Sequence, residues 1–263
     1  MSALLFFDID GTLITLDEKH LMPESTREAL YRAKENGHKI FINTGRVKTA
    51  IDRFLLEFGF DGLVCGCGTY IEYQGKPVFH HKLTKNQCIS YASMLREYGY
   101  QTVFEGKDRL FIEGDYHPGS FMEYIYSYFS KNSDYPIEGV GHPDFIFDKF
   151  TTVRMPGSDE AAFQRAFETD FTLIPHTDQV CEVVPKGFSK ATGIRLLADY
   201  LGASEEDCYA FGDSVNDMEM LQYVPHSVGM GNSAEKVLSV VEYRTRDILE
   251  DGIKEALVHY ELI

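Results

Sequence analysis

The chain has 263 residues, of which 44% are hydrophobic and 25% charged, so it can bury a sizeable core as a globular protein. Its 25 basic and 41 acidic residues give a formal charge of −16, which argues against a nucleic-acid partner. No apolar run approaches the about 18 residues of a membrane span, and no basic segment opens the chain as in a secretory signal, so we expect no membrane partner. The odd number of five cysteines is typical of free thiols in a reducing compartment, and we therefore expect a cytoplasmic location.

The start of the chain alternates short apolar runs with amphipathic segments. Strands are predicted at 4–7, 39–43 and 62–65, and helices at 23–35 and from about 47 to 58. Strands and helices in this alternation are typical of an α/β fold with a parallel sheet.

The pattern changes after about residue 82 and returns after residue 185. A hairpin at 69–81 is followed by predicted helices at 84–98, 118–130 and 158–168 and strands at 100–105, 109–113, 150–155, 170–175 and 180–184. This mixture predicts an α+β insert with an antiparallel sheet. Predicted helices at 190–201, 218–222, from 234 and at 250–260 then alternate with strands at 207–211 and 227–230. We therefore predict an α/β core formed by residues 1–83 and 185–263, with an inserted α+β domain at 84–184.

The first predicted strand ends on two aspartates, Asp8 and Asp10, which are followed by Gly11. The chain bends at the end of a strand, so both carboxyl groups can approach one point. Such a pair repels unless a cation lies between the groups, and oxygen ligands suit Mg²⁺. Thr12 adds a hydroxyl and a backbone N–H that could bind an anion, so the pattern predicts metal-assisted attack on a phosphoryl group. A Ca²⁺ loop is excluded because Leu13 stands where its glycine is needed, whereas a plain turn with solvated charges remains an alternative.

Polar side chains also follow two other predicted strands. Thr44 ends the second strand, Asp213 and Asp217 follow the strand at 207–211, and Lys190 opens the helix before that strand. Ligands of open parallel sheets bind beyond the carboxyl ends of the strands, so we expect these groups to meet the two N-terminal aspartates there. One carboxylate could act as a nucleophile and another as acid and base, while the lysine, the hydroxyl and a cation stabilise the phosphoryl oxygens.

Four stretches in this order resemble the motifs of the haloacid dehalogenase (HAD) superfamily, and the layout looks most like its Cof-type phosphatases. The stretches are Asp8-x-Asp10-Gly11-Thr12, Thr44-Gly45-Arg46, Lys190 and Gly212-Asp213-x-x-Asn216-Asp217. The resemblance implies an α/β fold with a Rossmann-like parallel-sheet core and makes the insert a C2B-type cap domain. It also implies that Asp8 is the nucleophile and Asp10 the general acid and base. Mg²⁺ would be bound by Asp8, Asp213 and the backbone carbonyl of Asp10. Asp217 would orient the waters on the metal.

The same resemblance implies a set of residues that bind the substrate or its phosphate. These residues are Thr44, Gly45, Arg46, Lys190 and Asn216. Lys186 is a rival for the role of the lysine, and Arg46 could equally be a solvated charge at the start of a helix. The stretch from Cys65 to Gly68 departs from the family, whose members often have Asn-Gly there, and this concerns substrate preference more than the chemistry.

The resemblance implies a Mg²⁺-dependent phosphatase that hydrolyses small phosphomonoesters, such as a sugar phosphate or a cofactor phosphate, through an aspartyl-phosphate. The partner would then be a small phosphorylated molecule, and no obligate protein partner is evident. A phosphotransferase or phosphomutase that uses the same aspartyl-phosphate is an alternative. A non-catalytic protein that binds a small ligand is a further alternative, although every catalytic position is filled.

Overall fold

The computed structural model describes residues 2–17, 19–113 and 119–263, which form two compact units. The first, here called the core unit, comprises Met1–Gly45, Phe60–Phe79 and Phe188–Ile263. The second, the insert unit, comprises Arg46–Gly59 and His80–Gly187. Segment 46–59 therefore belongs to the insert unit, whereas the sequence pattern places it within 1–83.

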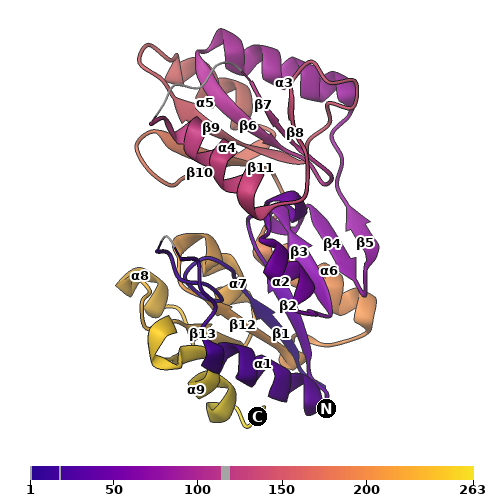
Figure 1. Cartoon of the computed structure of the whole chain (residues 1–263), viewed down its shortest axis with the longest axis vertical. Coiled ribbons are helices and arrows are strands. Elements are labelled where there is room, and N and C mark those ends of the chain that lie inside the picture. The colour runs from indigo at the N-terminus through magenta and orange to yellow at the C-terminus, as the bar shows by residue number, and fades with distance from the viewer. Residues whose placement is uncertain (1, 18, 114–118) are drawn as a thin grey trace. The chain divides into compact units, whose positions relative to one another are not determined.

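Among the described residues, the core unit is built on an eight-stranded sheet in the order β14-β13-β12-β1-β2-β3-β4-β5 (Figure 1). Its strands are β1 (Leu4–Phe7), β2 (Lys39–Asn43), β3 (Gly62–Cys65), β4 (Tyr70–Tyr73), β5 (Lys76–His80), β12 (Cys208–Gly212), β13 (His226–Gly229) and β14 (Tyr243–Arg244). β1 pairs in parallel with both β2 and β12, and Phe7 lies opposite Ile42 and Phe211. These three strands end at the same edge, so the polar residues that follow them emerge together.

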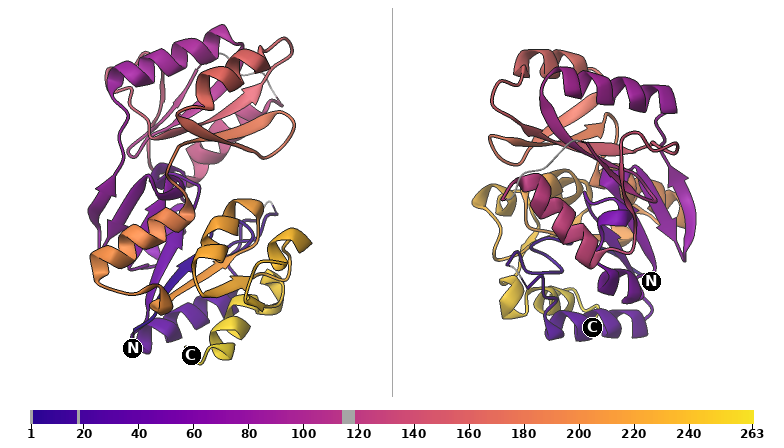
Figure 2. Two further views of the ribbon diagram at one scale, coloured as in Figure 1. Left: turned by 180° about the vertical axis from the view of Figure 1, so that it is seen from behind. Right: turned by 45° about the horizontal axis from the view of Figure 1, so that its top comes forward.

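Helices cover both faces of this sheet (Figures 1 and 2). α6 (Lys190–Leu201) packs on one face, where its apolar side chains join Leu4, Phe6 and Phe41 in one cluster. α1 (Glu24–Glu35) and α9 (Gly252–His259) lie side by side on the other face. The short helices α7 (Met218–Tyr223) and α8 (Glu235–Leu238) follow β12 and β13. Because strand residues alternate between faces, the residue after Phe7 is directed to the side that α6 covers.

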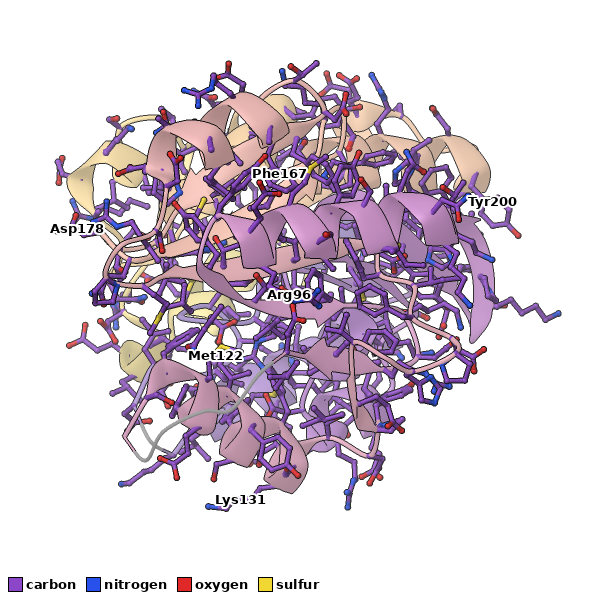
Figure 3. The ribbon with its side chains drawn as sticks, turned by 90° about the horizontal axis from the view of Figure 1, so that it is seen from above. Arg96, Met122, Lys131, Phe167, Asp178 and Tyr200 are labelled. Carbon is purple, nitrogen blue, oxygen red and sulfur yellow. The ribbon has the colours of Figure 1, made fainter. Side chains whose placement is uncertain are left out.

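The insert unit has a six-stranded sheet among its described residues, in the order β10-β11-β9-β6-β7-β8. Its strands are β6 (Tyr100–Glu105), β7 (Leu110–Ile112), β8 (Ile137–Gly139), β9 (Lys149–Arg154), β10 (Phe171–Pro175) and β11 (Val180–Pro185), and its longer helices are α3 (Lys85–Glu97), α4 (Phe121–Asn132) and α5 (Glu160–Phe167). α3 and α5 cover one face with a phenylalanine-rich core that includes Phe104 and Phe167. α4 packs on the opposite face, where Met122 meets Val103 and Val153. Figure 3 labels Phe167, the last residue of α5, and shows Lys131, near the end of α4, pointing outward.

These elements confirm the α/β fold class and most of the predicted segments. The short strands β8 and β14 are not indicated by the sequence pattern, and the predicted start of a helix at Pro118 lies outside the described residues. Within the described ranges, no helix has both the length and the apolar character needed to cross a membrane.

The predicted helix from about 47 to 58 is wrong in its middle. The segment forms a 3₁₀ turn (Lys48–Ala50) and a short helix, α2 (Arg53–Glu57). Between them Ile51 is extended, with φ −85° and ψ 134°. The carboxylate of Asp52 is bonded there to Arg46 at 2.9 Å and to the Tyr128 hydroxyl at 2.9 Å. This tertiary contact with α4 overrides the local helical pattern and cannot be seen from neighbouring residues.

Candidate active site

Three buried carboxylates converge beyond the ends of β1 and β12. One oxygen each of Asp8, Asp213 and Asp217 lies within 4.8 Å of the others. Asp8 follows β1 directly, and its N–H donates to the carbonyl of Phe211 at 3.0 Å, which fixes it beside the end of β12. All three belong to the core unit. The structure therefore brings these three aspartates together beyond the strand ends.

Lys190 is placed among these carboxylates. Its Nζ lies 2.7 Å from Asp8 Oδ1, 2.6 Å from Asp217 Oδ1 and 3.3 Å from Asn216 Oδ1, and its side chain is fully buried. Burial alone would lower the pKa of this ammonium group, but the carboxylates of Asp217 and Asp8 raise the pKa well above its ordinary value. Lys190 is therefore a fixed positive charge at the site.

Burial and the repulsion between neighbouring carboxylates raise the pKa values of Asp8 and Asp213. Burial, with repulsion from Asp217, raises the pKa of Asp8 well above its ordinary value, although Lys190 opposes this. Burial, again with repulsion from Asp217, raises the pKa of Asp213 to about 7. Burial and mutual repulsion thus disfavour the ionised forms of both carboxylates more strongly than Lys190 favours them.

The donor set fits a divalent cation. Asp8 and Asp213 offer carboxylate oxygens, the hard ligands that Mg²⁺ prefers, and a cation between them would favour their ionised forms. Gly11 permits this approach, because it has φ +80° and a Cβ there would lie 2.3 Å from Asp213 Oδ2.

The loop after β12 is held by its own aspartate. Asp217 Oδ2 accepts the N–H groups of Asp213 at 3.0 Å and Ser214 at 2.9 Å, while Oδ1 binds Lys190. The sequence indicated that the Thr12 hydroxyl could bind an anion. In the structure this hydroxyl donates to Asp213 Oδ1 at 2.9 Å. Both oxygens of Asp217 are thus engaged by the protein, which suits a residue that orders the loop.

A sequence profile of haloacid dehalogenase-like hydrolases matches residues 5–257. The chain belongs to this family. Among the similar proteins, YkrA of Bacillus subtilis (strain 168), to which phosphatase activity is ascribed, is 29% identical over 266 residues that span 100% of this chain and 99% of YkrA. The solved structure of BT4131, described as a HAD subclass IIB sugar phosphatase, is 27% identical with a TM-score of 0.82 and is matched over 100% of both chains. BT1666 from Bacteroides thetaiotaomicron, described among HAD phosphatases, is 26% identical with a TM-score of 0.81, matched over 100% of this chain and 96% of BT1666.

These comparisons confirm the resemblance to the HAD superfamily that the four motifs indicated. They also confirm the fold, which is similar to that of the subclass IIB protein BT4131. The expected enzyme class, a phosphoric monoester hydrolase, agrees with the family and with its phosphatase members.

The structure does not bring every predicted HAD residue into the carboxylate cluster. The side chain of Asp10 is partly exposed and lies outside the group of three carboxylates that could hold a metal. Thr44 and Gly45 follow β2 at the same edge of the sheet, and Thr44 is buried. Arg46 belongs to the insert unit, where it pairs with Asp52 and lies 5.8 Å from the ring centre of Tyr128.

The departure from the family at Cys65–Gly68 coincides with unusual backbone geometry. Cys67 has φ 54° and ψ 41°, the left-handed region that asparagine and glycine tolerate best. Its N–H donates to the Thr44 carbonyl at 3.1 Å, so this turn anchors the end of β2.

Two polar residues at the site are absent from the sequence prediction. Asn232 Nδ2 donates to the Gly11 carbonyl at 2.8 Å and supports the loop after β1. Asn43 ends β2 and donates to the Lys190 carbonyl at 3.1 Å. The signal for Asn43 was present, since it is a polar residue that closes the apolar run Ile40–Ile42.

Proposed function

We propose that this HAD-like hydrolase is a Mg²⁺-dependent phosphatase of small phosphomonoesters and that Asp8 forms an aspartyl-phosphate. The observation that carries the proposal is the convergence of Asp8, Asp213 and Asp217 on one buried point with Lys190 bonded among them. Lys190 positions the carboxylate of Asp8, and a cation held with Asp213 would favour its ionised, nucleophilic form.

In the first step an oxygen of Asp8 attacks the phosphorus, and the bond from phosphorus to the leaving oxygen breaks. Asp10 donates a proton to that oxygen, so the alcohol leaves neutral. In the second step water attacks the aspartyl-phosphate, Asp10 takes its proton, and inorganic phosphate and free Asp8 result. Lys190 and Thr44, with Asn216, Gly45 and Arg46 as further candidates, are proposed to bind the phosphoryl oxygens.

The residues that would hold Mg²⁺ are Asp8, Asp213 and the backbone carbonyl of Asp10, with Asp217 ordering the loop beside them. When bound, the metal would offset negative charge on the carboxylates and on the phosphoryl oxygens.

We propose that the α+β insert, predicted at 84–184, is the cap domain of this hydrolase and restricts it to small substrates. A sugar phosphate or a cofactor phosphate is the proposed substrate class, and the description of BT4131 as a sugar phosphatase supports the former. We propose a reducing, cytoplasmic compartment, because the odd number of five cysteines is typical of proteins that keep their thiols reduced.

The test is phosphate release from p-nitrophenyl phosphate by the wild type and by Asp8→Asn, each with Mg²⁺ or with EDTA. Asparagine keeps the shape of the side chain and removes the nucleophile. We expect Mg²⁺-dependent turnover in the wild type and none in the variant, followed by a panel of sugar and cofactor phosphates. Full activity of the variant would overturn the mechanism, and transfer of the phosphate to an added sugar instead of water would favour the phosphotransferase.

A further inference from the structure

Asn43 is the polar residue that closes the apolar run of β2. It closes β2 after Ile40, Phe41 and Ile42, and it is completely buried. Its Nδ2 donates to the backbone carbonyl of Lys190 at 3.1 Å and lies 3.4 Å from Met220 Sδ. The bond to the carbonyl settles the amide orientation, because the reverse orientation would set two oxygens against each other.

Keeping an asparagine at this position is costly for the fold. Its Oδ1 finds no hydrogen-bond donor among the residues that the structure describes, although the atom is buried. A buried polar atom without a partner destabilises a protein, whereas an apolar side chain of similar shape would bury no such atom. The cost indicates that the Nδ2 end of this side chain has a use other than stability.

The bond reaches the main chain of the lysine itself. Lys190 is the first residue of α6, and Ser189 caps this helix by accepting the N–H of Thr192. The cap fixes the start of the helix within its own segment but does not link it to β2, the strand that Thr44 follows. The side chain of Asn43, the residue directly before Thr44, makes that link by its bond to the main chain of Lys190. The Nζ of the same lysine binds Asp8 and Asp217.

The start of α6 also packs closely on the core sheet. A Cβ at Gly193 would lie 2.3 Å from Val64 Cγ1, and a Cβ at Gly68 would lie 2.7 Å from the Ser189 carbonyl, so the helix start packs closely on β3 and the turn after it. A long lysine side chain keeps a given position only if its backbone is fixed, since it has several rotatable bonds. Small shifts of a reacting or charge-stabilising group lower rates strongly.

We propose that Asn43 is a positioning residue that fixes the start of α6 so that Lys190 Nζ stays between Asp8 and Asp217. This inference rests on the proposed phosphatase function for its effect on rate, but not for its effect on the position of Lys190. Asn43 acts through Lys190 and touches no reacting atom itself.

The test compares Asn43→Leu and Asn43→Ala with Ser227→Ala. Ser227 is a matched control, because it is a buried polar residue of β13 in the same sheet, and its Oγ accepts the N–H of Glu242 at 3.0 Å. We expect the Asn43 variants to melt no lower than the control. With p-nitrophenyl phosphate and Mg²⁺, kcat should fall by about ten- to a hundredfold while KM changes less, because the lysine stabilises charge that develops in the transition state. The control should keep its kcat.

Crystal structures of the wild type and of Asn43→Leu supply the readout that does not depend on activity. We expect Nζ to lie between Asp8 and Asp217 in the wild type and to leave at least one of them in the variant. Unchanged contacts of Nζ in the variant, an unchanged kcat, or a loss of kcat that only follows a loss of folded protein would each overturn the inference. If the wild type releases no phosphate, the proposed function fails, and the position of Nζ in the two crystal structures still decides the role of Asn43.

Discussion

A buried ion cluster in the insert unit predicts how the stability of this protein depends on acid. Glu182 on β11 lies 2.7 Å from Lys149 Nζ, and its other oxygen lies 3.0 Å from His176 Nε2. Lys149 also lies 3.0 Å from Glu105. Burial alone would raise the pKa of Glu182, but Lys149 and His176 together lower the pKa from 4.5 to about 2.

This depressed pKa sets the sign and size of the effect. A carboxyl group with a lower pKa in the folded state stabilises the fold above its unfolded pKa, and this contribution is lost as pH falls toward the folded pKa. A shift from 4.5 to about 2 corresponds to about 3 kcal/mol at pH 7. By the same linkage, the contribution falls to about 1.4 kcal/mol at pH 3.

The variant Glu182→Gln removes this contribution and leaves Lys149 paired with Glu105. Urea unfolding followed by far-UV circular dichroism at pH 7 and pH 3 measures the difference between wild type and variant. We expect the variant to be less stable by about 3 kcal/mol at pH 7 and by about half of that at pH 3. A difference that is the same at both pH values, or that grows in acid, would refute the assigned pKa and its cause.

Three further changes follow from the geometry. Gly11→Ala should lower kcat at least about a hundredfold in steady-state assays and destabilise the fold by about 1–2 kcal/mol. The reason is that Gly11 has φ +80° and the new Cβ would clash with Asp213, so wild-type rates would contradict the loop geometry. Asp213→Asn should raise the Mg²⁺ concentration for half-maximal activity at least about tenfold in a metal titration, and an unchanged midpoint would remove this residue from the metal site. Tyr128→Phe deletes the hydroxyl bonded to Asp52 and should cost about 1 kcal/mol in urea unfolding without changing activity, whereas no loss would mean that the Asp52 contact adds nothing to stability.

The sequence suffices to place the aspartates of the candidate site together, because their positions follow from the ends of strands. Asp8 and Asp213 follow parallel neighbouring strands, so a pattern of apolar runs that end on acidic residues suffices to bring them together. Lys190 was found by its place at the start of a helix and by resemblance to the family motif.

The remaining features depend on contacts between distant segments, which local patterns do not contain. The break in the expected helix at 47–58 follows from the bonds of Asp52 to Arg46 and Tyr128, and Tyr128 lies 76 positions further along the chain. The role of Asn43 depends on Lys190, which lies 147 positions away. A polar residue at the end of an apolar run indicates a possible functional side chain. Its hydrogen-bond partner can be identified only from the three-dimensional structure.

The central claim is that Asp8 carries the phosphoryl group, and trapping that group is its most direct test. In Asp10→Asn the general base for the second step is lost, while p-nitrophenolate can still leave without a proton, so the covalent intermediate should accumulate. We would mix this variant with p-nitrophenyl phosphate and Mg²⁺, quench it in acid and map the modified peptide by mass spectrometry. We expect one phosphoryl group on Asp8, formed together with a burst of p-nitrophenolate. A phosphoryl group on another residue, or turnover with no modified peptide, would contradict it.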